Sequence, residues 1–321
     1  MRDPIFNSPF APMMYAFLEK RKSEGYTNRN QIYYLEEFDR LVLQSEFVGT
    51  VIEEKLIEQW DSYKPYLSNR TKIPRHNIIR SFCEYLYERD RLSFVPDRSK
   101  IKGTSTFSPY IFTAEEISRL LNAADNLPQR KNAPYRKIVL PAIFRVLYCS
   151  GLRVNEALCL KIEDFDSEDG TLFVRNGKGG KDRIIPIHPT LTAYLQEYCS
   201  QLPDTVWLFP SSRGHYSRNT VYENFRELLV ICKIPHTGKG PRVHDLRHTF
   251  CVHTLEKQLA AGYEPMQIMP RMAAYLGHKS YRETSWYIHL TIVSFPELSA
   301  KLSAAFNGII PVTEDLENEE N

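Results

Sequence analysis

Residues 96–110 interrupt the helical pattern of this chain and divide it into two parts. Three helix-breaking residues punctuate the segment: Pro96, Gly103 and Pro109. Apolar residues repeat with a helical period both before and after it. We therefore expect a helical domain at 10–95, a linker at 96–110 and a second domain at 111–308.

Four helical patterns lie before the linker. They cover residues 13–24, 30–44, 50–63 and 73–91. The third begins Thr50-Val51-Ile52-Glu53, which is a capping-box pattern. We therefore expect Thr50 to cap the third helix.

The second part opens with a stronger helix signal. A capping box runs from Thr113 to Glu116, at the start of an apolar repeat. Another helix is expected at 135–150, because Gly151 follows it and glycine commonly ends helices. Both signals are local and depend on no distant contact.

A β-hairpin is expected in the middle of the second part. Strand patterns at 171–174 and 183–187 flank the glycine-rich basic turn 175–182. Helices dominate from there to about residue 306. The expected fold class is therefore mainly α with a small β-hairpin, an α+β chain.

Charge and composition narrow the class of protein. The formal net charge is +2, yet the last eight residues hold five acids and no base, so the remainder is more basic. We expect 309–321 to be a disordered acidic tail. The chain has no long apolar run for a membrane, no signal-peptide pattern and no C-x-x-C pair among its six cysteines. A cytoplasmic protein is expected, compatible with DNA binding but not diagnostic of it.

Side chains suited to phosphoryl transfer occur in four separate segments. The first, SGLRVNEAL, places Arg153 and Glu156 on one helix face, three residues apart. The second, NGKGGKDR, places Lys178 in a flexible basic turn. Taken alone, the first segment is typical of a surface ion pair, and the second is typical of a flexible loop.

The other two segments carry histidines. The third, HDLRHTF, contains His244 and Arg247, which share a helix face. His248 is four residues from His244, but the segment lacks the glutamate of an HExxH motif and a third ligand, so we expect no metal. In the fourth, LGHKSYRETSWYIHL, Tyr287 follows His278 by nine residues.

Together these residue types fit metal-free phosphoryl transfer. Arginines bind phosphate oxygens bidentately and keep their charge. Tyrosine is a weak nucleophile at its free pKa of about 10 and needs a base or a positive field. A lysine or histidine can protonate the departing 5′-oxygen. A positioned pair of arginines can replace a metal ion.

In this order, the motifs resemble those of the tyrosine recombinase family, also called the phage integrase family. Its members have an arginine, a lysine in a β-hairpin, a His-x-x-Arg pair, a histidine or tryptophan, and a tyrosine; this chain has each in turn. The resemblance covers about residues 110–295 and is specific, because five motifs occur in one order. It implies six catalytic residues: Arg153, Lys178, His244, Arg247, His278 and Tyr287.

The resemblance also implies how these residues treat the scissile phosphate. Arg153 and Arg247 clamp it, and His278 hydrogen-bonds it. His244 helps to position the reacting groups or to take up a proton from them. Glu156 matches an acidic position of the family and holds the site together.

The remaining implied roles concern the attacking and leaving oxygens. Tyr287 attacks to leave a 3′-phosphotyrosine and a free 5′-hydroxyl, with Lys178 as the general acid, so neither ATP nor another cofactor is needed. Lys181 competes with Lys178 for its role, and Tyr281 competes with Tyr287.

The implied partner is double-stranded DNA at a specific recombination site. Region 10–95 is similar to the family's core-binding, SAM-like domain in size and helix content. The resemblance further implies a tetramer on DNA, with accessory proteins or a second recombinase as further candidates and no membrane. Five basic residues are candidates for DNA contact: Arg98, Lys100, Lys102, Lys181 and Arg183.

Three further points stay open at this stage. Residues 256–272 lengthen the stretch between Arg247 and His278 relative to Xer-type members, which favours integration or transposition by a mobile element over chromosome-dimer resolution. A type IB topoisomerase or a regulator without catalysis are the alternatives. An apolar stripe in the last expected helix packs either on its own domain or on a neighbouring protomer: Leu298, Leu302 and Phe306.

Overall fold

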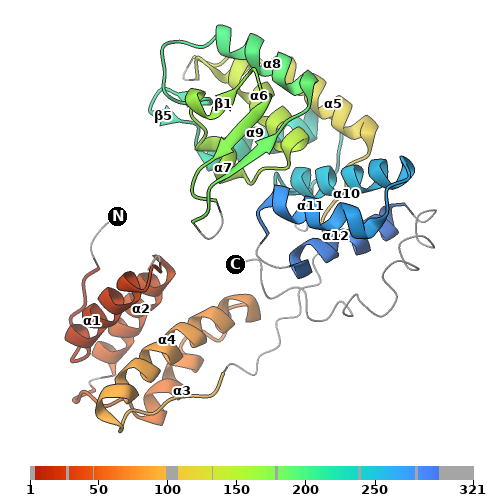
Figure 1. Ribbon diagram of the computed structural model, residues 1–321. Coiled ribbons are helices and arrows are strands. Elements are labelled where there is room, and N and C mark those ends of the chain that lie inside the picture. Colours follow the sequence, from red (N-terminus) through yellow and green to blue (C-terminus); the bar gives the residue numbers. More distant parts are fainter. Residues whose placement is uncertain are drawn as a thin grey trace. The chain divides into compact units, whose positions relative to one another are not determined.

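The chain divides into two compact units, residues 1–106 and 107–321, each described here by itself (Figure 1). The computed structural model describes residues 4–26, 29–45, 47–98, 108–131, 133–177, 180–237, 240–278 and 281–295. The expected final helix stripe and the acidic tail lie outside these residues. So do Lys178, Lys100 and Lys102.

The described residues of the first unit form a bundle of four helices. They are α1 (Ala11–Ser23), α2 (Arg29–Gln44), α3 (Glu54–Ser62) and α4 (Asn69–Asp90). Both α1 and α2 pack against α4. Their shared core is aromatic, since Phe10, Phe38, Trp60 and Phe82 are all fully buried. The unit therefore has a hydrophobic core of its own.

The predicted cap at Thr50 is wrong. Helix α3 begins only at Glu54, and Glu53 precedes it in an extended conformation. The backbone N–H of Ile52 donates to Ser93 Oγ at 3.2 Å, and its carbonyl accepts from Phe94 at 2.7 Å. The N–H and the carbonyl of Ile52 are thus both bonded to residues about forty positions further along the chain. They are not available for a helix that starts at Thr50, so the local capping pattern does not produce one.

The second unit is built around helix α6 (Arg136–Ser150). Most of its residues are buried, because α5, α7, α8 and α10 all contact it. The other helices of the unit are α5 (Ala114–Asp125), α7 (Val154–Leu158), η1 (Ile162–Asp164), α8 (Pro189–Ser200), α9 (Arg218–Ile231), α10 (Asp245–Ala260), α11 (Pro265–Leu276) and α12 (Tyr281–Ser294). The capping box is confirmed, since Thr113 Oγ1 accepts from the Glu116 amide and a Glu116 oxygen accepts from that of Thr113.

The predicted hairpin is confirmed. Strands β1 (Phe165–Asp166), β2 (Thr171–Val174) and β3 (Arg183–Pro186) form an antiparallel sheet in the order β1-β2-β3. Leu172 pairs with Ile185, and both side chains are buried. Strand β3 ends one residue earlier than expected. A second small sheet pairs β4 (Pro210–Ser211) with β5 (Gly214–His215).

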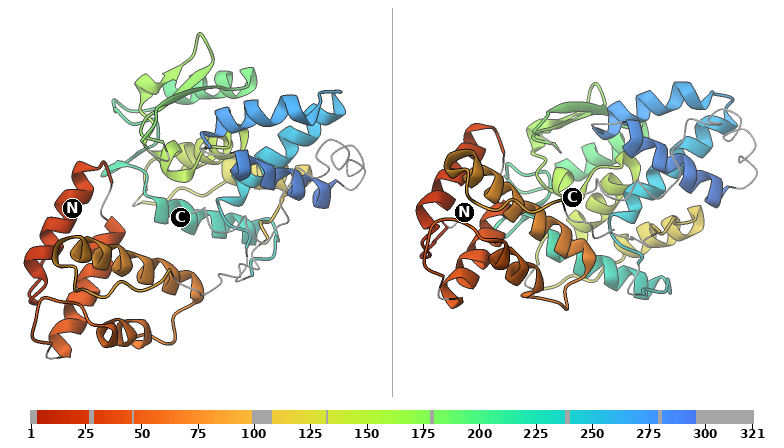
Figure 2. Two further views of the ribbon diagram at one scale, coloured as in Figure 1. Left: turned by 60° about the horizontal axis from the view of Figure 1, so that its bottom comes forward. Right: turned by 90° about the horizontal axis from the view of Figure 1, so that it is seen from below.

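Helices α10, α11 and α12 form a layer of their own. Figures 1 and 2 show them grouped together, apart from the three-stranded sheet. Helix α12 packs on both α10 and α11, and α10 joins the layer to α6. Leu255, Met269 and Ile288 lie in its core. This layer brings the last three sequence motifs together.

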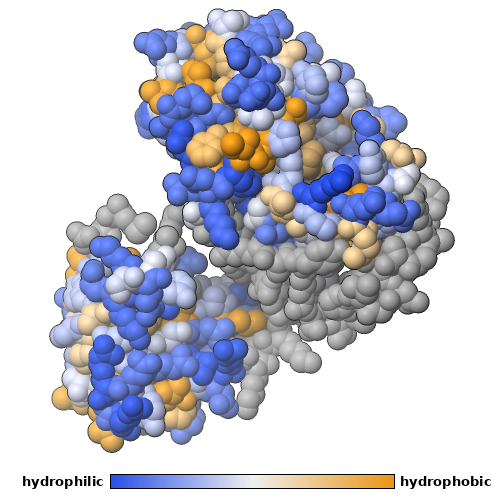
Figure 3. All heavy atoms as spheres, viewed as in Figure 1, coloured by the Kyte–Doolittle hydropathy of each residue, from blue (hydrophilic) through white to orange (hydrophobic). Residues whose placement is uncertain are grey.

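The observed fold confirms the expected class, mainly helical with small antiparallel sheets. In Figure 3, hydrophilic residues cover much of the described surface in view, with smaller apolar patches between them. Among the described residues, no helix is long and apolar enough to cross a membrane.

Candidate active site

Arg153 is placed by a tight reversal of the chain. Helix α6 ends at Ser150, and Gly151 turns the backbone with φ +59°. A Cβ at that position would collide with the ring of Phe250. The turn allows Arg153 to precede α7, where its Nη1 donates to Glu156 Oε1 at 3.0 Å and its backbone N–H to Oε2 at 3.2 Å.

A second arginine reaches the same carboxylate from the sheet. Arg183, the first residue of β3, donates from Nη1 and Nη2 to the two oxygens of Glu156, at 3.2 and 2.9 Å. Its Nε donates to the carbonyl of Tyr275 at 3.0 Å. The Glu156 carboxylate therefore holds Arg153 and Arg183 together.

Arg247 lies at the centre of the site. It is 2% exposed, in the first turn of α10. Its Nη1 donates to the Gly151 carbonyl at 2.6 Å, and its Nη2 to the Leu276 carbonyl at 3.2 Å. Nη2 also lies 3.1 Å from Nε2 of His278. One guanidinium thus joins the turn before Arg153 to the end of α11.

His278 and Tyr287 complete this arrangement. Gly277 ends α11 with φ +67°, and His278 follows it. The Nδ1 of His278 lies 2.8 Å from Thr284 Oγ1. The ring of Tyr287 stacks on that of His278, with centroids 6.1 Å apart and planes 9° apart, and the tyrosine is 2% exposed.

Two histidines near the start of α10 lie next to each other, and one of them lies beside the tyrosine. The His248 ring is 5.7 Å from that of Tyr287 and 4.8 Å from that of His244. His248 is buried, and its Nδ1 has no hydrogen-bond partner among the described atoms. His244 precedes the first residue of α10, and its carbonyl accepts from the backbone N–H of Arg247.

Burial and neighbouring cations set the protonation of the site. Burial would raise the pKa of Glu156, but Arg183 and Arg153 lower it to about 2. Burial, with Arg247 and Arg153 beside it, lowers the pKa of His244 to about 3. The carboxylate is therefore ionised and the imidazole neutral at pH 7.

The arginines remain charged in this surrounding. Burial opposes the charge of Arg247, but Tyr287, Cys251 and Glu156 outweigh it and raise its pKa. Burial and the nearby charge of Arg247 lower the pKa of Arg153. Three guanidinium groups thus lie around one carboxylate, and the excess positive charge suits an anion.

The structure gathers five of the six expected catalytic side chains: Arg153, His244, Arg247, His278 and Tyr287. The sixth, Lys178, lies between β2 and β3 in the sequence, outside the described residues. Arg98 and Lys181 are exposed, and Arg183 is engaged with Glu156. Sequence reasoning missed Thr284, and it weighed His248 only as a metal ligand; the one available signal was its spacing of four from His244.

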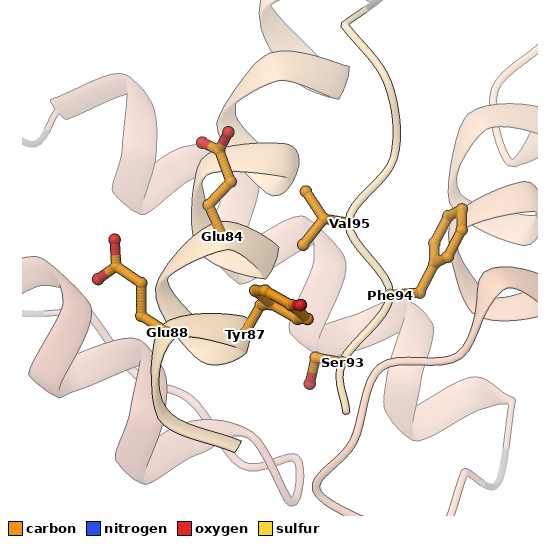
Figure 4. Close-up of a pocket in the computed structure, with 6 residues that line it drawn as sticks. All are labelled: Glu84, Tyr87, Glu88, Ser93, Phe94 and Val95. Carbon is orange, nitrogen blue, oxygen red and sulfur yellow. The ribbon is translucent and has the colours of Figure 1, made fainter. Parts of the chain in front are cut away.

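Two pockets elsewhere in the described residues are less suited to binding a phosphate. One in the first unit is lined by Glu84, Tyr87 and Glu88 of α4 and by Ser93–Val95, with Phe94 pointing away from α4 (Figure 4). Its two carboxylates do not suit a phosphate. A second is lined by Trp207, Tyr135 and the β4–β5 hairpin, and contains none of the motifs. Within the described ranges, no cluster of three or more His, Cys, Asp or Glu could hold a metal ion.

Comparison with known sequences gives consistent matches. The family model described as "Phage integrase family" matches residues 111–292. Tyrosine recombinase XerA of Pyrococcus furiosus is 35% identical over 220 residues, which are 67% of this chain and 69% of the relative. Tyrosine recombinase XerC of Oceanobacillus iheyensis is 29% identical over 293 residues, 87% of this chain and 90% of the relative.

Solved structures share the fold at lower identity. The Tn1549 transposon integrase in complex with a circular intermediate DNA has a TM-score of 0.63 and 17% identity, and covers 86% of this chain and 94% of its own. The XerH site-specific recombinase bound to palindromic difH substrate has a TM-score of 0.61 and 20% identity, covering 84% and 77%.

Proposed function

This chain belongs to the phage integrase family, the tyrosine recombinases, and we propose that Tyr287 is the residue with which it cuts and rejoins DNA. The reaction is site-specific recombination through a 3′-phosphotyrosine link. The supporting observation is that Tyr287 stacks on His278 while Arg247 hydrogen-bonds the same imidazole. Motifs far apart in the chain thus meet at one place. In the proposed complex, the phosphate lies there, between the arginines and the phenol of Tyr287.

In the proposed reaction, Arg153 and Arg247 bind the nonbridging oxygens of the scissile phosphate. The Tyr287 oxygen attacks phosphorus while its proton passes to a neutral imidazole, for which His244 is the candidate. The bond to the 5′-oxygen breaks, and Lys178 protonates that oxygen. His278 hydrogen-bonds the phosphate.

Rejoining is the reverse of cleavage. A 5′-hydroxyl attacks the phosphotyrosine, the phosphodiester forms again, and the phenol recovers its proton. The bond energy is kept in the protein–DNA link, so the cycle consumes no ATP. Attack by the 5′-hydroxyl of a partner duplex gives a recombinant, whereas attack by the original strand gives only the nicking and resealing of a topoisomerase.

The DNA partner is proposed on the basis of the relatives. The Tn1549 integrase structure is a complex with DNA, and the XerH structure is bound to its difH substrate; we extend DNA binding to the present chain. The first unit, with its own helical core, would be the core-binding domain. A tetramer, accessory proteins and a role in a mobile element belong to the same proposal, as does DNA contact by Lys181 and Arg98.

A nicked suicide substrate carrying the recombination site tests the nucleophile. The protein should form a covalent adduct in the presence of EDTA. Tyr287→Phe removes only the attacking oxygen, so it should abolish the adduct and leave DNA affinity unchanged. Tyr281→Phe is the matched control and should still form the adduct. An adduct that persists in Tyr287→Phe, or that needs Mg²⁺, overturns the assignment.

A further inference from the structure

The guanidinium of Arg183 connects three parts of the site. Two of its nitrogens donate to the two oxygens of Glu156 in a fork-to-fork pair. The third donates to the carbonyl of Tyr275, at the end of α11. Because Arg153 shares Glu156 Oε1, the sheet, the first arginine and the helix before His278 are linked through this one side chain.

Two glycines from different motifs leave room for this guanidinium. A Cβ at Gly177, in the hairpin, would lie 2.8 Å from Arg183 Nη1. A Cβ at Gly277, directly before His278, would lie 3.3 Å from Arg183 Cζ and Nε. The first distance forces some atom to shift, and the second is tighter than an ordinary contact. Any residue other than glycine at either position would therefore press on Arg183.

We propose that Arg183 is a positioning residue of the recombination reaction, which couples the base of the hairpin to Arg153 and to the start of the His278 segment. Gly177 directly precedes Lys178 in the sequence, so Arg183 also lies against the part of the hairpin that leads to the expected general acid. The inference rests on the proposed function, because it assigns to Arg183 an effect on the rate of cleavage.

This assignment replaces our first expectation that Arg183 binds DNA directly. Nε, Nη1 and Nη2 each already donate to a protein oxygen, and the residue is only partly exposed. A phosphate could be reached only through the second hydrogens of Nη1 and Nη2, because the bidentate bond holds the guanidinium against a carboxylate that has lost most of its contact with water. The fork geometry also separates arginine from lysine, since a single ammonium cannot bond both Glu156 oxygens and the Tyr275 carbonyl in the same directions.

Single-turnover adduct formation on the suicide substrate, measured at saturating DNA, tests the proposal together with the salt dependence of DNA binding. Arg183→Gln should slow the adduct step on the order of 10- to 100-fold, the size expected when a reacting group moves by about an ångström. Arg183→Lys keeps the charge but loses the fork, so it should also be slow. Neither change should alter the slope of log affinity against log salt, because no phosphate contact is lost.

Two further variants isolate the effect. Arg175→Gln is the matched control, since Arg175 is also an arginine of the hairpin but pairs with Asp164 and Glu163, away from the site; it should cleave at the wild-type rate. Gly177→Ala keeps all charges and places a methyl group against the guanidinium, the Lys181 carbonyl and the Glu156 carboxylate, so it should slow cleavage. If Arg183→Gln does not fold, Arg183→Lys decides the matter.

The outcomes separate clearly. A salt slope reduced by about one in Arg183→Gln, with the wild-type rate at saturation, would identify a phosphate contact and overturn the proposal. Wild-type rates in Arg183→Lys, or an equal loss in Arg175→Gln, would overturn it too. Failure of the wild-type chain to form any adduct would instead contradict the proposed function.

Discussion

Nη2 of Arg247 lies 3.1 Å from Nε2 of His278, and this distance determines the tautomer of the histidine. A guanidinium has only donors, so Nε2 must be the acceptor. A neutral imidazole then carries its proton on Nδ1, which donates to Thr284 Oγ1 at 2.8 Å. For His278 to donate to a phosphate through Nε2, the proton must move to Nε2 and Arg247 must turn away from that nitrogen.

Thr284 should therefore control the reactivity of His278. Thr284→Val removes the acceptor and leaves Nδ1–H without its partner in a buried place, at a cost of about 1–3 kcal/mol. We expect adduct formation to slow by roughly 10- to 100-fold, as when the partner that orients a functional histidine is removed. Thr284→Ser keeps the hydroxyl and should cleave normally. Suicide-substrate kinetics measure both, and wild-type rates in Thr284→Val would contradict the role.

Gly151 should tolerate no side chain. Gly151→Ala places a methyl group against the Phe250 ring at φ +59°, so the left-handed conformation costs about 1–2 kcal/mol and the overpacking about 1–3 more. Gly262→Ala is the control in the same unit, because its φ is +91° and nothing lies within 4 Å of the added Cβ. Urea unfolding should show the larger loss for Gly151→Ala. Equal losses would mean that the ring moves aside freely.

Acid should destabilise the chain through His244. Its pKa in the folded state is lowered to about 3, against about 6.5 when unfolded, so the unfolded state takes up a proton first as the pH falls. The stabilisation is complete above pH 6.5 and is lost progressively towards pH 3. At pH 5 the loss is about 2 kcal/mol.

The comparison of wild type with His244→Gln isolates this group, since His248 is present in both. The difference in unfolding free energy between the two proteins should change by about 2 kcal/mol between pH 7.5 and pH 5, with wild type losing more. Denaturant unfolding at the two pH values measures it. A difference independent of pH would show that His244 titrates normally in the folded chain.

The two units should bind DNA cooperatively. If each grips the recombination site, the second contact becomes intramolecular, and residues 107–321 alone should bind far more weakly than the full chain. Binding should also weaken steeply with salt. Gel shifts over a range of salt concentrations measure both, and equal affinity of residues 107–321 and the full chain would count against a clamp.

The segment after α12 should support assembly. We expect deletion of 294–321 to leave binding to a single half-site intact but to impair the tetrameric synapse and strand exchange, because a head-to-tail contact closes a ring. Deletion of 314–321 alone should have little effect. Native gels and a recombination assay test both truncations, and normal recombination after the longer deletion would mean that the segment packs on its own domain or not at all.

Sequence patterns within a few neighbouring residues were sufficient to predict many of the helices and strands. The capping box at Thr113, the glycine stop at Gly151 and the strand at 171–174 all lie where the sequence predicts them. Each depends on backbone geometry within a few residues. Thr50 shows the limit, because Ile52 bonds to Ser93 and Phe94 instead of joining a helix.

The order of five motifs identified the family and the chemistry, since residue types and their sequence order do not depend on packing. Only the tertiary structure decided which donors are already used. Arg183 reads as one more basic residue of a hairpin, yet Glu156 and the Tyr275 carbonyl hold all three of its nitrogens. Hydrogen-bond partners distant in the chain meet only when the helices pack, and a sequence contains no distances.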